Sequence, residues 1–494
     1  MIHLDRDAET PFTDQIVMQI ASLVRNGHLP SGTRLPSIRK MAGTLTVSSA
    51  TVVAAYDRLI ARGLIESRAS SGFFVAPRHP GLSTQTREAA PERYDALSMI
   101  RRLLQPQDGM FHAGSGFLPE AWLEDTLSTR LLARVARKGK RAFVNPGTAE
   151  GYAPLRAQLA VKLGMAGIPA HADQILMTFG VSQAFDLIAR ALISPGDTVV
   201  VEEPGFFGLV AQLRAHGARI LTVPRHDTGP DPAAFEELCA NFRPKLFFTQ
   251  TLMHNPTGTT TEPACASEIL HIAARHNVLI VEDDIYGDLF PGGHTVHLAQ
   301  LDKLQRVIFV SSFSKVLSPN VRVGYIAAPQ ALYESFLEQK LLSVMTTSEF
   351  DERLIYEMLT DGGYRKHIER VKQRLARNMP AVVHGLTAAG LTTLEQDYAG
   401  VFVWAKLPEG IHTETLVRDA AEHKFLLTPG ALFFLDCEHS PWLRFNAASA
   451  NDVRLFDYLG GSISALRHNS VAAPRSERAG GRAELIIEKR STQR

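Results

Sequence analysis

Apolar and polar positions in the first part of the chain follow the pattern of three short helices. Between residues 15 and 27 the apolar residues recur at i, i+4, i+7 and i+8, which places them on one face of a helix that a glycine ends. Ser37 can cap a second helix that runs through Leu45, and Ser48 or Ser49 can cap a third. This pattern predicts a small helical domain at the N-terminus.

Two short strands are predicted directly after the third helix. Apolar residues lie on both sides of a Ser/Gly turn at residues 70–72, which is typical of a β-hairpin. Three helices followed by such a hairpin predict a winged helix-turn-helix, a module that binds double-stranded DNA, over residues 1–77.

The pattern changes on both sides of the central part of the chain. Residues 78–108 are rich in Pro and polar residues, which predicts an interdomain linker, although residues 94–104 could be helical. Residues 468–494 offer few apolar side chains to bury, so we expect this tail to be disordered.

The central part, residues 109–467, alternates strand-like apolar runs with helical patterns. Such alternation predicts a mostly parallel sheet covered by helices, so the expected fold class is a multi-domain chain with an α/β body. The clearest of these runs are residues 198–201, 246–249, 278–281 and 307–310.

Composition narrows the class of protein. Of the 494 residues, 45% are hydrophobic and 21% are charged, which is usual for a globular protein and excludes a fully disordered chain, a collagen or a coiled coil. No apolar run is long enough to span a membrane, and the first residues lack the pattern of a secretory signal. The three cysteines have no spacing typical of disulfides or zinc sites, so we expect no metal and a cytoplasmic location.

Net charge indicates no partner for the chain as a whole, because it is only +1. Within residues 1–78, however, nine Lys and Arg residues face six Asp and Glu residues. Such a small positive excess predicts modest non-specific affinity for DNA, so we expect two copies of this head to be needed at an operator with paired half-sites.

Polar side chains follow three of the predicted strands. Lys315 comes soon after the last of the four apolar runs, Asn255 after the second and Asp283 after the third. A single lysine in such a place is ordinarily a solvated charge. Because ligands bind at the carboxyl ends of strands in open α/β sheets, three such clusters predict a ligand site.

Four short motifs in this order carry a resemblance to a known family. They are His-Asn-Pro-Thr-Gly at 254–258, Asp-x-x-Tyr at 283–286, Ser-x-x-Lys at 312–315 and Arg-x-Gly at 322–324. Through them the chain from about residue 110 to 467 resembles the fold-type I aminotransferases, which use pyridoxal 5'-phosphate.

The N-terminal helices resemble the GntR type of regulator, through Leu-Pro-Ser-x-Arg at 35–39 and Val-Ser-x-x-Thr-Val at 47–52. Together the two modules resemble a MocR-type transcriptional regulator. The resemblance implies a large domain at about residues 140–340, with a mostly parallel sheet, and a smaller α+β domain in the remainder of the body. It also implies a head-to-tail homodimer, because sites of this family are built at a dimer interface.

The resemblance implies roles around the cofactor ring. Lys315 is the lysine that forms the Schiff base with pyridoxal phosphate, the internal aldimine. Asp283 matches the carboxylate beside the pyridine nitrogen, for which Asp284 is the less suitable alternative. Asn255 and Tyr286 are hydrogen-bond donors that match the positions holding the ring oxygen.

The phosphate needs donors and positive charge. The residues from 179 to 183 open a helix, so the backbone N–H groups of Val181 and Ser182 can point at an anion with the helix dipole behind them. By resemblance, Ser312 and Arg322 complete this phosphate site.

Two further residues match family positions and also have simpler explanations. Phe206 matches the aromatic residue that stacks on the pyridine ring, and the alternative is an ordinary core phenylalanine. Arg444 matches the arginine that binds a substrate carboxylate, here the carboxylate of an effector, and the alternative is an ordinary surface arginine.

The chain departs from the family pattern at two places. Phe143 lies nearest to the position of a tyrosine that reaches the partner subunit's phosphate, and a phenylalanine cannot donate that hydrogen bond. Ser49 replaces the usual arginine of the DNA-reading helix, which removes one direct contact.

Candidate DNA contacts lie on the second and third predicted helices and on the wing. Each arginine taken alone could equally be a solvated charge, so the module is a firmer prediction than its single residues. The candidates are Arg34, Ser37, Arg39, Ser48, Ser49, Thr51, Arg58, Arg68 and Gly72.

Three interpretations of function remain open from the sequence. The first is a pyridoxal-phosphate-dependent, DNA-binding transcriptional regulator of the bacterial cytoplasm, associated with the nucleoid when DNA-bound. Its aminotransferase-like domain would sense the cofactor, an amino acid or an amine as an aldimine. The second is an active aminotransferase that carries a DNA-binding head, because the residues for amino transfer are present. The third is a cofactor-free scaffold. The DNA-binding head favours the first, and the sequence leaves the effector, the operator and any turnover undetermined.

Overall fold

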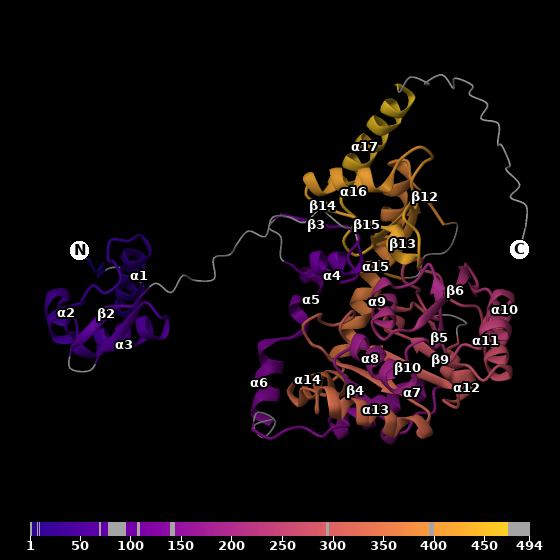
Figure 1. Cartoon of the computed structure of the whole chain (residues 1–494), viewed down its shortest axis with the longest axis horizontal. Coiled ribbons are helices and arrows are strands. Elements are labelled where there is room, and N and C mark those ends of the chain that lie inside the picture. The colour runs from indigo at the N-terminus through magenta and orange to yellow at the C-terminus, as the bar shows by residue number, and fades with distance from the viewer. Residues whose placement is uncertain are drawn as a thin grey trace, which may run out of the picture. The chain divides into compact units, whose positions relative to one another are not determined.

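The computed structural model forms two compact units, Met1–Arg93 and Tyr94–Arg494 (Figure 1). The structure describes residues 2–6, 8, 10–68, 71–77, 95–105, 109–138, 144–292, 296–394 and 400–472. The predicted linker before residue 95, the tail from residue 473 and Phe143 lie outside the described residues.

The first unit is a three-helix domain with a two-stranded wing, as its pattern predicts. Its elements are α1 (Phe12–Arg25), α2 (Ile38–Leu45), α3 (Ser49–Ala61), β1 (Ile65–Arg68) and β2 (Gly72–Val75). β1 and β2 pair antiparallel. The core holds Ile16, Ile20, Val52 and Leu59, all fully buried, around Tyr56.

Caps fix where the helices of this unit begin. The Ser37 hydroxyl accepts a hydrogen bond from the backbone N–H of Lys40 at the start of α2. The Ser48 hydroxyl accepts one from Thr51 at the start of α3, so Ser48 and not Ser49 is the cap. Capping by serine satisfies N–H groups that have no partner within the helix.

The second unit is built on an eight-stranded sheet with the order β4-β11-β10-β9-β8-β5-β6-β7. The five strands from β10 to β6 are parallel, whereas β11 is antiparallel to both of its neighbours. The strands are β4 (Ile175–Thr178), β5 (Thr198–Glu203), β6 (Arg219–His226), β7 (Gly229–Pro230), β8 (Leu246–Thr249), β9 (Leu279–Asp283), β10 (Val307–Ser312) and β11 (Gly324–Ala327). The predicted mostly parallel sheet is confirmed, and β9 begins one residue later than its apolar run.

Helices cover both faces of this sheet and make three layers. One face packs against α8 (Val181–Leu192), α9 (Phe207–Ala215) and α13 (Gln330–Ser343). The other face packs against α7 (Ala153–Met165), α10 (Pro232–Phe242), α11 (Pro263–Arg275) and α12 (Leu298–Asp302). Because both faces are covered, the strands β4, β8 and β10 are buried at every position instead of alternating.

A smaller α+β part follows the large sheet. Its antiparallel sheet has the order β12-β13-β16-β15, and β14 pairs in parallel with β3. The strands are β3 (Phe111–His112), β12 (Thr392–Thr393), β13 (Phe402–Lys406), β14 (Phe425–Leu426), β15 (Thr428–Pro429) and β16 (Trp442–Asn446). The remaining α-helices of the unit are α4 (Ala96–Leu104), α5 (Glu120–Leu123), α6 (Thr129–Lys138), α14 (Glu349–Thr360), α15 (Gly363–Ala388), α16 (Thr413–Glu422) and α17 (Val453–Ala472).

The helix α4 lies in the range for which the sequence predicts a linker. Its Met99 is buried in a small cluster with Phe207, Trp404 and Phe433, so α4 packs on the second unit. None of the described helices is both long and apolar enough to cross a membrane.

Candidate functional site

Three neighbouring parallel strands carry polar residues to one edge of the large sheet. Asp283 is the last residue of β9, Ser312 is the last residue of β10, and Asn255 follows β8 by six residues. Because these strands run parallel, their carboxyl ends meet at the same edge.

A cavity of 670 Å³ opens at this edge. All ten residues that the sequence predicts for the cofactor and the effector carboxylate line it. They are Val181, Ser182, Phe206, Asn255, Asp283, Tyr286, Ser312, Lys315, Arg322 and Arg444. The structure therefore brings these ten residues together around one cavity. The role of each residue stays a prediction.

Lys315 is half-buried near two other cations. Burial, together with the positive charges of Arg444 and Arg322, lowers the pKa of Lys315 to about 7. Its Nζ lies 3.5 Å from the centroid of the Phe117 ring. A Cβ at Gly116 would lie 3.6 Å from the same Nζ, so the glycine leaves space beside the amine. A substantial fraction of the amine is therefore uncharged near neutral pH.

Asp283 lines the cavity and is half-buried. Burial, and next the charge of Asp284, raise the pKa of Asp283 to about 8. One of its oxygens accepts a hydrogen bond from the backbone N–H of Ile285 at 3.1 Å. Asp284, the alternative that the sequence leaves open, is not among the lining residues and lies 3.9 Å from His297.

The start of α8 and Arg322 form a place for an anion. Gly180, at the N-cap of α8, has a φ of 78°, and a Cβ there would lie 2.9 Å from Arg322 Nη2. Arg322 donates to the Phe179 carbonyl at 3.0 Å and to the Ser314 hydroxyl at 2.9 Å. The first N–H groups of a helix have no intrahelical partner, so those of Val181 and the next residue are available to a phosphate.

Arg444 is not a surface arginine, so that alternative is wrong. It is only 2% exposed, and its Cζ lies 4.5 Å from the centroid of the Phe402 ring. It donates to Asn255 Oδ1 at 2.6 Å and to the Gly114 carbonyl at 2.7 Å. These two hydrogen bonds use one N–H each of Nη1 and Nη2, so the guanidinium has further N–H groups for a ligand.

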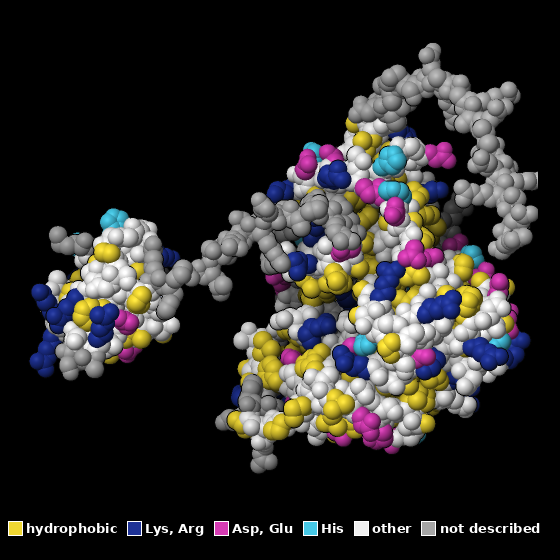
Figure 2. Space-filling view, viewed as in Figure 1, with side chains coloured by type: hydrophobic (Ala, Val, Ile, Leu, Met, Phe, Trp, Pro, Cys, Tyr) yellow, Lys and Arg dark blue, Asp and Glu magenta, His cyan; other side chains and the backbone are white. Residues whose placement is uncertain are grey.

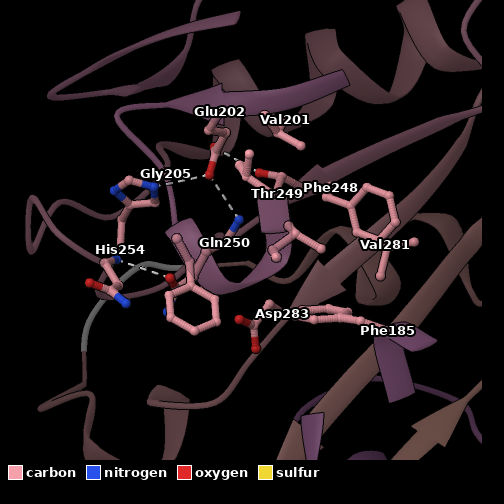
Figure 3. Close-up of a pocket in the computed structure, with 14 residues that line it drawn as sticks. Phe185, Val201, Glu202, Gly205, Phe248, Thr249, Gln250, His254, Val281 and Asp283 are labelled. Carbon is pink, nitrogen blue, oxygen red and sulfur yellow. Dashed lines mark hydrogen bonds and ion pairs between the residues drawn. The ribbon is translucent and has the colours of Figure 1, made fainter. Parts of the chain in front are cut away.

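Behind the cavity, a buried polar network fixes the loop that carries Asn255 (Figure 3). Glu202 accepts hydrogen bonds from Arg225 Nη1 at 2.5 Å and from the Gln250 N–H at 3.0 Å. Burial opposes ionisation, but the charge of Arg225, the interaction with His254 and the hydrogen bond from Gln250 together outweigh it and lower the pKa of Glu202 to about 2. Burial, and next the charge of Arg225, lower the pKa of His254 to about 4, so its imidazole is neutral near pH 7. The Nε2 atom of this imidazole lies 3.2 Å from Glu202 Oε2.

Several residues of the cavity and of the polar network behind it were not found from the sequence. Glu202 belongs to β5 and could have been found by the same strand-end argument that found Asp283. Phe117, Gln250 and Ser314 also line or support the cavity, but they have no motif of their own. The residues of α4 that line it lie in the predicted linker, where nothing in the sequence connects them to the site.

In the first unit, the predicted DNA contacts divide into engaged and available side chains. The hydroxyls of Ser37 and Ser48 cap helices, Arg58 pairs with Asp14, and Arg68 pairs with Glu66 at 2.7 Å.

The wing holds Arg34 and Arg68 around Phe74, at 6.0 and 4.6 Å from the ring centroid. Gly72 has a φ of 103° at the start of β2, which favours glycine. Arg39, Ser49 and Thr51 lie on α2 and α3, where Lys and Arg side chains gather on the surface (Figure 2).

Two family models match the chain. Residues 12–75 match the bacterial regulatory proteins of the gntR family, and residues 113–458 match the class I and II aminotransferases.

Relatives of two kinds are similar to the chain. The 2-aminoadipate transaminase of Thermus thermophilus is 31% identical over 364 residues, which cover 71% of this chain and 89% of the relative. The probable rhizopine catabolism regulatory protein MocR of Rhizobium meliloti is 30% identical over 461 residues, which cover 89% of this chain and 90% of the relative.

A solved structure has the same fold as the second unit. It is LysN, the alpha-aminoadipate aminotransferase of Thermus thermophilus, complexed with N-(5'-phosphopyridoxyl)-L-leucine. The TM-score is 0.69 at 29% sequence identity, and the match covers 75% of this chain and 95% of that one.

Proposed function

This chain belongs to the class I and II aminotransferase family and carries a gntR-type domain ahead of it, and from that premise we propose that it is a transcriptional regulator controlled by ligands of its aminotransferase domain. The two modules are combined as in the MocR-type regulators, and the cofactor is pyridoxal 5'-phosphate. One observation carries the proposal: the ten residues that the sequence predicts for the cofactor and the effector carboxylate line one cavity in a chain that also has a winged helix-turn-helix.

The chemistry of the cavity fits the cofactor. When bound, pyridoxal phosphate supplies an aldehyde that combines with amines and a ring that withdraws electrons from the group attached to it. Lys315 offers the amine, because its lowered pKa leaves a substantial fraction of it uncharged near pH 7. Asp283 would hold the proton of the ring nitrogen, since its raised pKa allows it to share a proton there.

Other residues would hold the two charged ends of the ligand. Arg322 and the first N–H groups of α8, at Val181 and Ser182, would bind the phosphate. Arg444 would bind the carboxylate of an amino acid through its planar guanidinium, exchanging its present bond to Asn255 for one to the ligand. The present bond to Arg444 uses Asn255 Oδ1, so the Nδ2 amide of Asn255 would donate to the ring oxygen.

Control of DNA binding requires that the ligand favour one conformation of the protein over another. A ligand with equal affinity for both conformations would leave the equilibrium unchanged. By linkage, DNA that favours one conformation must change the affinity for the effector by the same factor. This reciprocity can be measured from either side.

We also propose that the protein acts as a homodimer on an operator with paired half-sites, in the bacterial cytoplasm and at the nucleoid when it is bound to DNA. The end of α13 and the turn after it expose large apolar side chains, with Leu342 82% and Met345 69% exposed. Exposed apolar side chains that are close together are typical of interfaces. Two copies would supply the two DNA-binding heads that such an operator needs.

A second candidate function is amino transfer, which the 31% identity to a 2-aminoadipate transaminase favours. The residues that amino transfer requires of the protein, Lys315, Asp283 and Arg444, lie together in the cavity. Sustained transfer from common amino donors to 2-oxoglutarate at ordinary enzyme rates, of about 1–1000 per second, would support this function.

The test is DNA binding with and without ligands. We expect pyridoxal phosphate, or an amino compound added to the loaded protein, to change the affinity of the wild-type protein for its upstream DNA in gel-shift titrations. Lys315→Ala should still bind the DNA and lose the response, because its head is intact and its amine is absent. DNA affinity that no ligand alters in the wild-type protein would overturn ligand control.

A further inference from the structure

Lys315 lies in the middle of a short turn that follows β10. The backbone N–H of Leu317 closes this turn by donating to the Phe313 carbonyl at 2.9 Å. Phe313, Val316 and Leu317 are all buried, whereas the lysine between them is half-buried. The backbone of the turn sets the direction in which the lysine side chain leaves the chain. A contact that holds the turn therefore also places the amine.

Two side chains of the helix α15 hold this turn, one on each side of the lysine. The ring of Tyr364 packs edge-to-face on the ring of Phe313, with 5.5 Å between the centroids. The Nε2 atom of His367 lies 2.7 Å from the Val316 carbonyl oxygen. Tyr364 and His367 are three positions apart on the helix, which places them on the same face. This face of α15 thus contacts the chain two residues before Lys315 and one residue after it.

The ring of His367 is only 1% exposed, and its two nitrogens have different partners. A carbonyl oxygen can only accept, so Nε2 carries the proton and donates it to Val316. Burial lowers the pKa of His367, so the ring is neutral near pH 7 and Nδ1 is an acceptor. The Thr126 hydroxyl lies 3.4 Å from Nδ1 and can donate to it. These two contacts fix the tautomer and the orientation of the ring.

The Val316 carbonyl depends on this histidine. It belongs to the residue directly after Lys315, and within the described residues no other group donates to it. A buried carbonyl without a donor is unfavourable, so without His367 the turn would rearrange to bring this oxygen to water or to another donor. Such a rearrangement would move the Lys315 amine from its place near Arg444 and Arg322.

We propose that His367 is a positioning residue for Lys315, and that α15 thereby sets where the amine lies in the cavity. The inference rests on the part of the proposed function in which Lys315 takes up pyridoxal phosphate, and it is independent of ligand control of DNA binding. His367 is not among the described residues that line the cofactor cavity. It acts through the Val316 carbonyl and not by contact with the cofactor.

The first test measures the Lys315 amine in the cofactor-free, full-length protein. Only the uncharged amine reacts with acetic anhydride. Labelling over a range of pH, read by mass spectrometry relative to the exposed Lys303, therefore gives the midpoint at which Lys315 loses its proton. In the wild-type protein we expect this midpoint near pH 7. In His367→Leu it should rise by about one pH unit, because the amine leaves its half-buried place near two arginines.

Cofactor binding gives a second measurement. His367→Leu should bind pyridoxal phosphate about tenfold more weakly than the wild-type protein in titrations followed by visible absorbance, because one buried hydrogen bond is lost. His367→Gln should restore both properties, since its amide nitrogen reaches the position of Nε2 and can donate to Val316. His367→Asn is one carbon shorter and should resemble His367→Leu. It replaces the leucine variant where that variant does not fold.

Two control variants on α15 separate positioning from a general loss of stability. Leu375→Ala removes a buried side chain about two turns further along the helix. It should lower the Tm at least as much as His367→Leu does and keep the wild-type midpoint of Lys315. His384→Leu changes an exposed histidine of the same helix and should alter neither the Tm nor the midpoint.

Three outcomes overturn the inference. They are a wild-type midpoint in both His367→Leu and His367→Asn, an equal shift of the midpoint in Leu375→Ala, and a His367→Gln variant that behaves like His367→Asn. The proposed function fails separately, when Lys315→Ala takes up pyridoxal phosphate with the wild-type absorbance or when DNA affinity does not respond to any ligand.

Discussion

Burial has opposite effects on the two ionisable groups at the centre of the site. It disfavours charge on both, so it lowers the pKa of Lys315 to about 7 and raises that of Asp283 to about 8. Near neutral pH a substantial fraction of the amine in the ligand-free site is therefore uncharged, and the acid is mostly protonated. These are the protonation states needed by a nucleophile for an aldehyde and by a proton donor to a ring nitrogen.

The lowered pKa of Lys315 predicts how cofactor uptake depends on pH. Only the uncharged amine attacks, so the rate should rise about tenfold per pH unit below pH 7 and level off above it. Mixing the cofactor-free protein with pyridoxal phosphate at pH 5.5–9, while recording visible absorbance, measures this. A rate that still rises steeply at pH 9 would show a lysine with an ordinary pKa.

A pair of variants identifies the source of this shift. Arg444→Met removes one of the two positive charges that lower the pKa of Lys315, so the midpoint of uptake should move to higher pH. Arg444→Lys keeps the charge and should stay closer to the wild-type midpoint. Equal midpoints in both variants and the wild type would leave burial as the dominant cause.

Asp283 makes the stability of the cofactor-free protein depend on pH. Its folded pKa is above the unfolded value, so the folded state binds more protons and loses stability as pH rises from about 4 to 8. Asp283→Asn removes this loss, so the Tm of the variant minus that of the wild type should increase by a few degrees between pH 5 and 8. Thermal unfolding across that range, with the exposed Asp227→Asn as control, tests it. A difference that is constant with pH contradicts the buried acid.

At the scale of elements, neighbouring serines at the start of α3 have separate functions. Ser48 caps the helix, and Ser49 is its first residue, one of the predicted DNA contacts. Ser48→Ala should destabilise α3 by about 1 kcal/mol, or about fivefold in amide protection measured by hydrogen exchange. Ser49→Ala should leave protection unchanged and alter only DNA affinity. The reverse pattern would assign the cap to Ser49.

Elements that depend on local patterns were predictable from the sequence. The caps of α2 and α3 are set by single serines, and β8 covers its apolar run without a shift. Residues at strand ends could be grouped because parallel strands bring their carboxyl ends together, which is how Lys315, Asn255 and Asp283 were found.

Elements that depend on distant contacts were not predictable. Arg444 meets Asn255 across 189 positions of sequence, and only that packing shows that it is buried. The apolar face of α4 resembles part of a polar linker until Met99 is seen to pack against Trp404. Such contacts are set by how the small sheet and the large sheet fold against each other, which no single motif contains.

At the scale of the whole molecule, the net charge of +1 averages a mildly basic head and a much larger body. A head with so few excess cations has a weak electrostatic attraction to DNA, and this attraction weakens further as salt increases. Specific binding then depends on joining two heads, because the second head binds at a high effective concentration once the first is bound.

The exposed apolar side chains at the end of α13 allow this dependence to be tested. Leu342→Glu with Met345→Glu places charges on the apolar surface, so the protein should become monomeric in light scattering and lose about 100-fold or more in operator affinity. Met165→Glu, at an 84% exposed residue of α7, is the matched control and should change neither property. A monomeric variant with wild-type operator affinity would mean that one head suffices, whereas a dimeric variant would place the interface elsewhere.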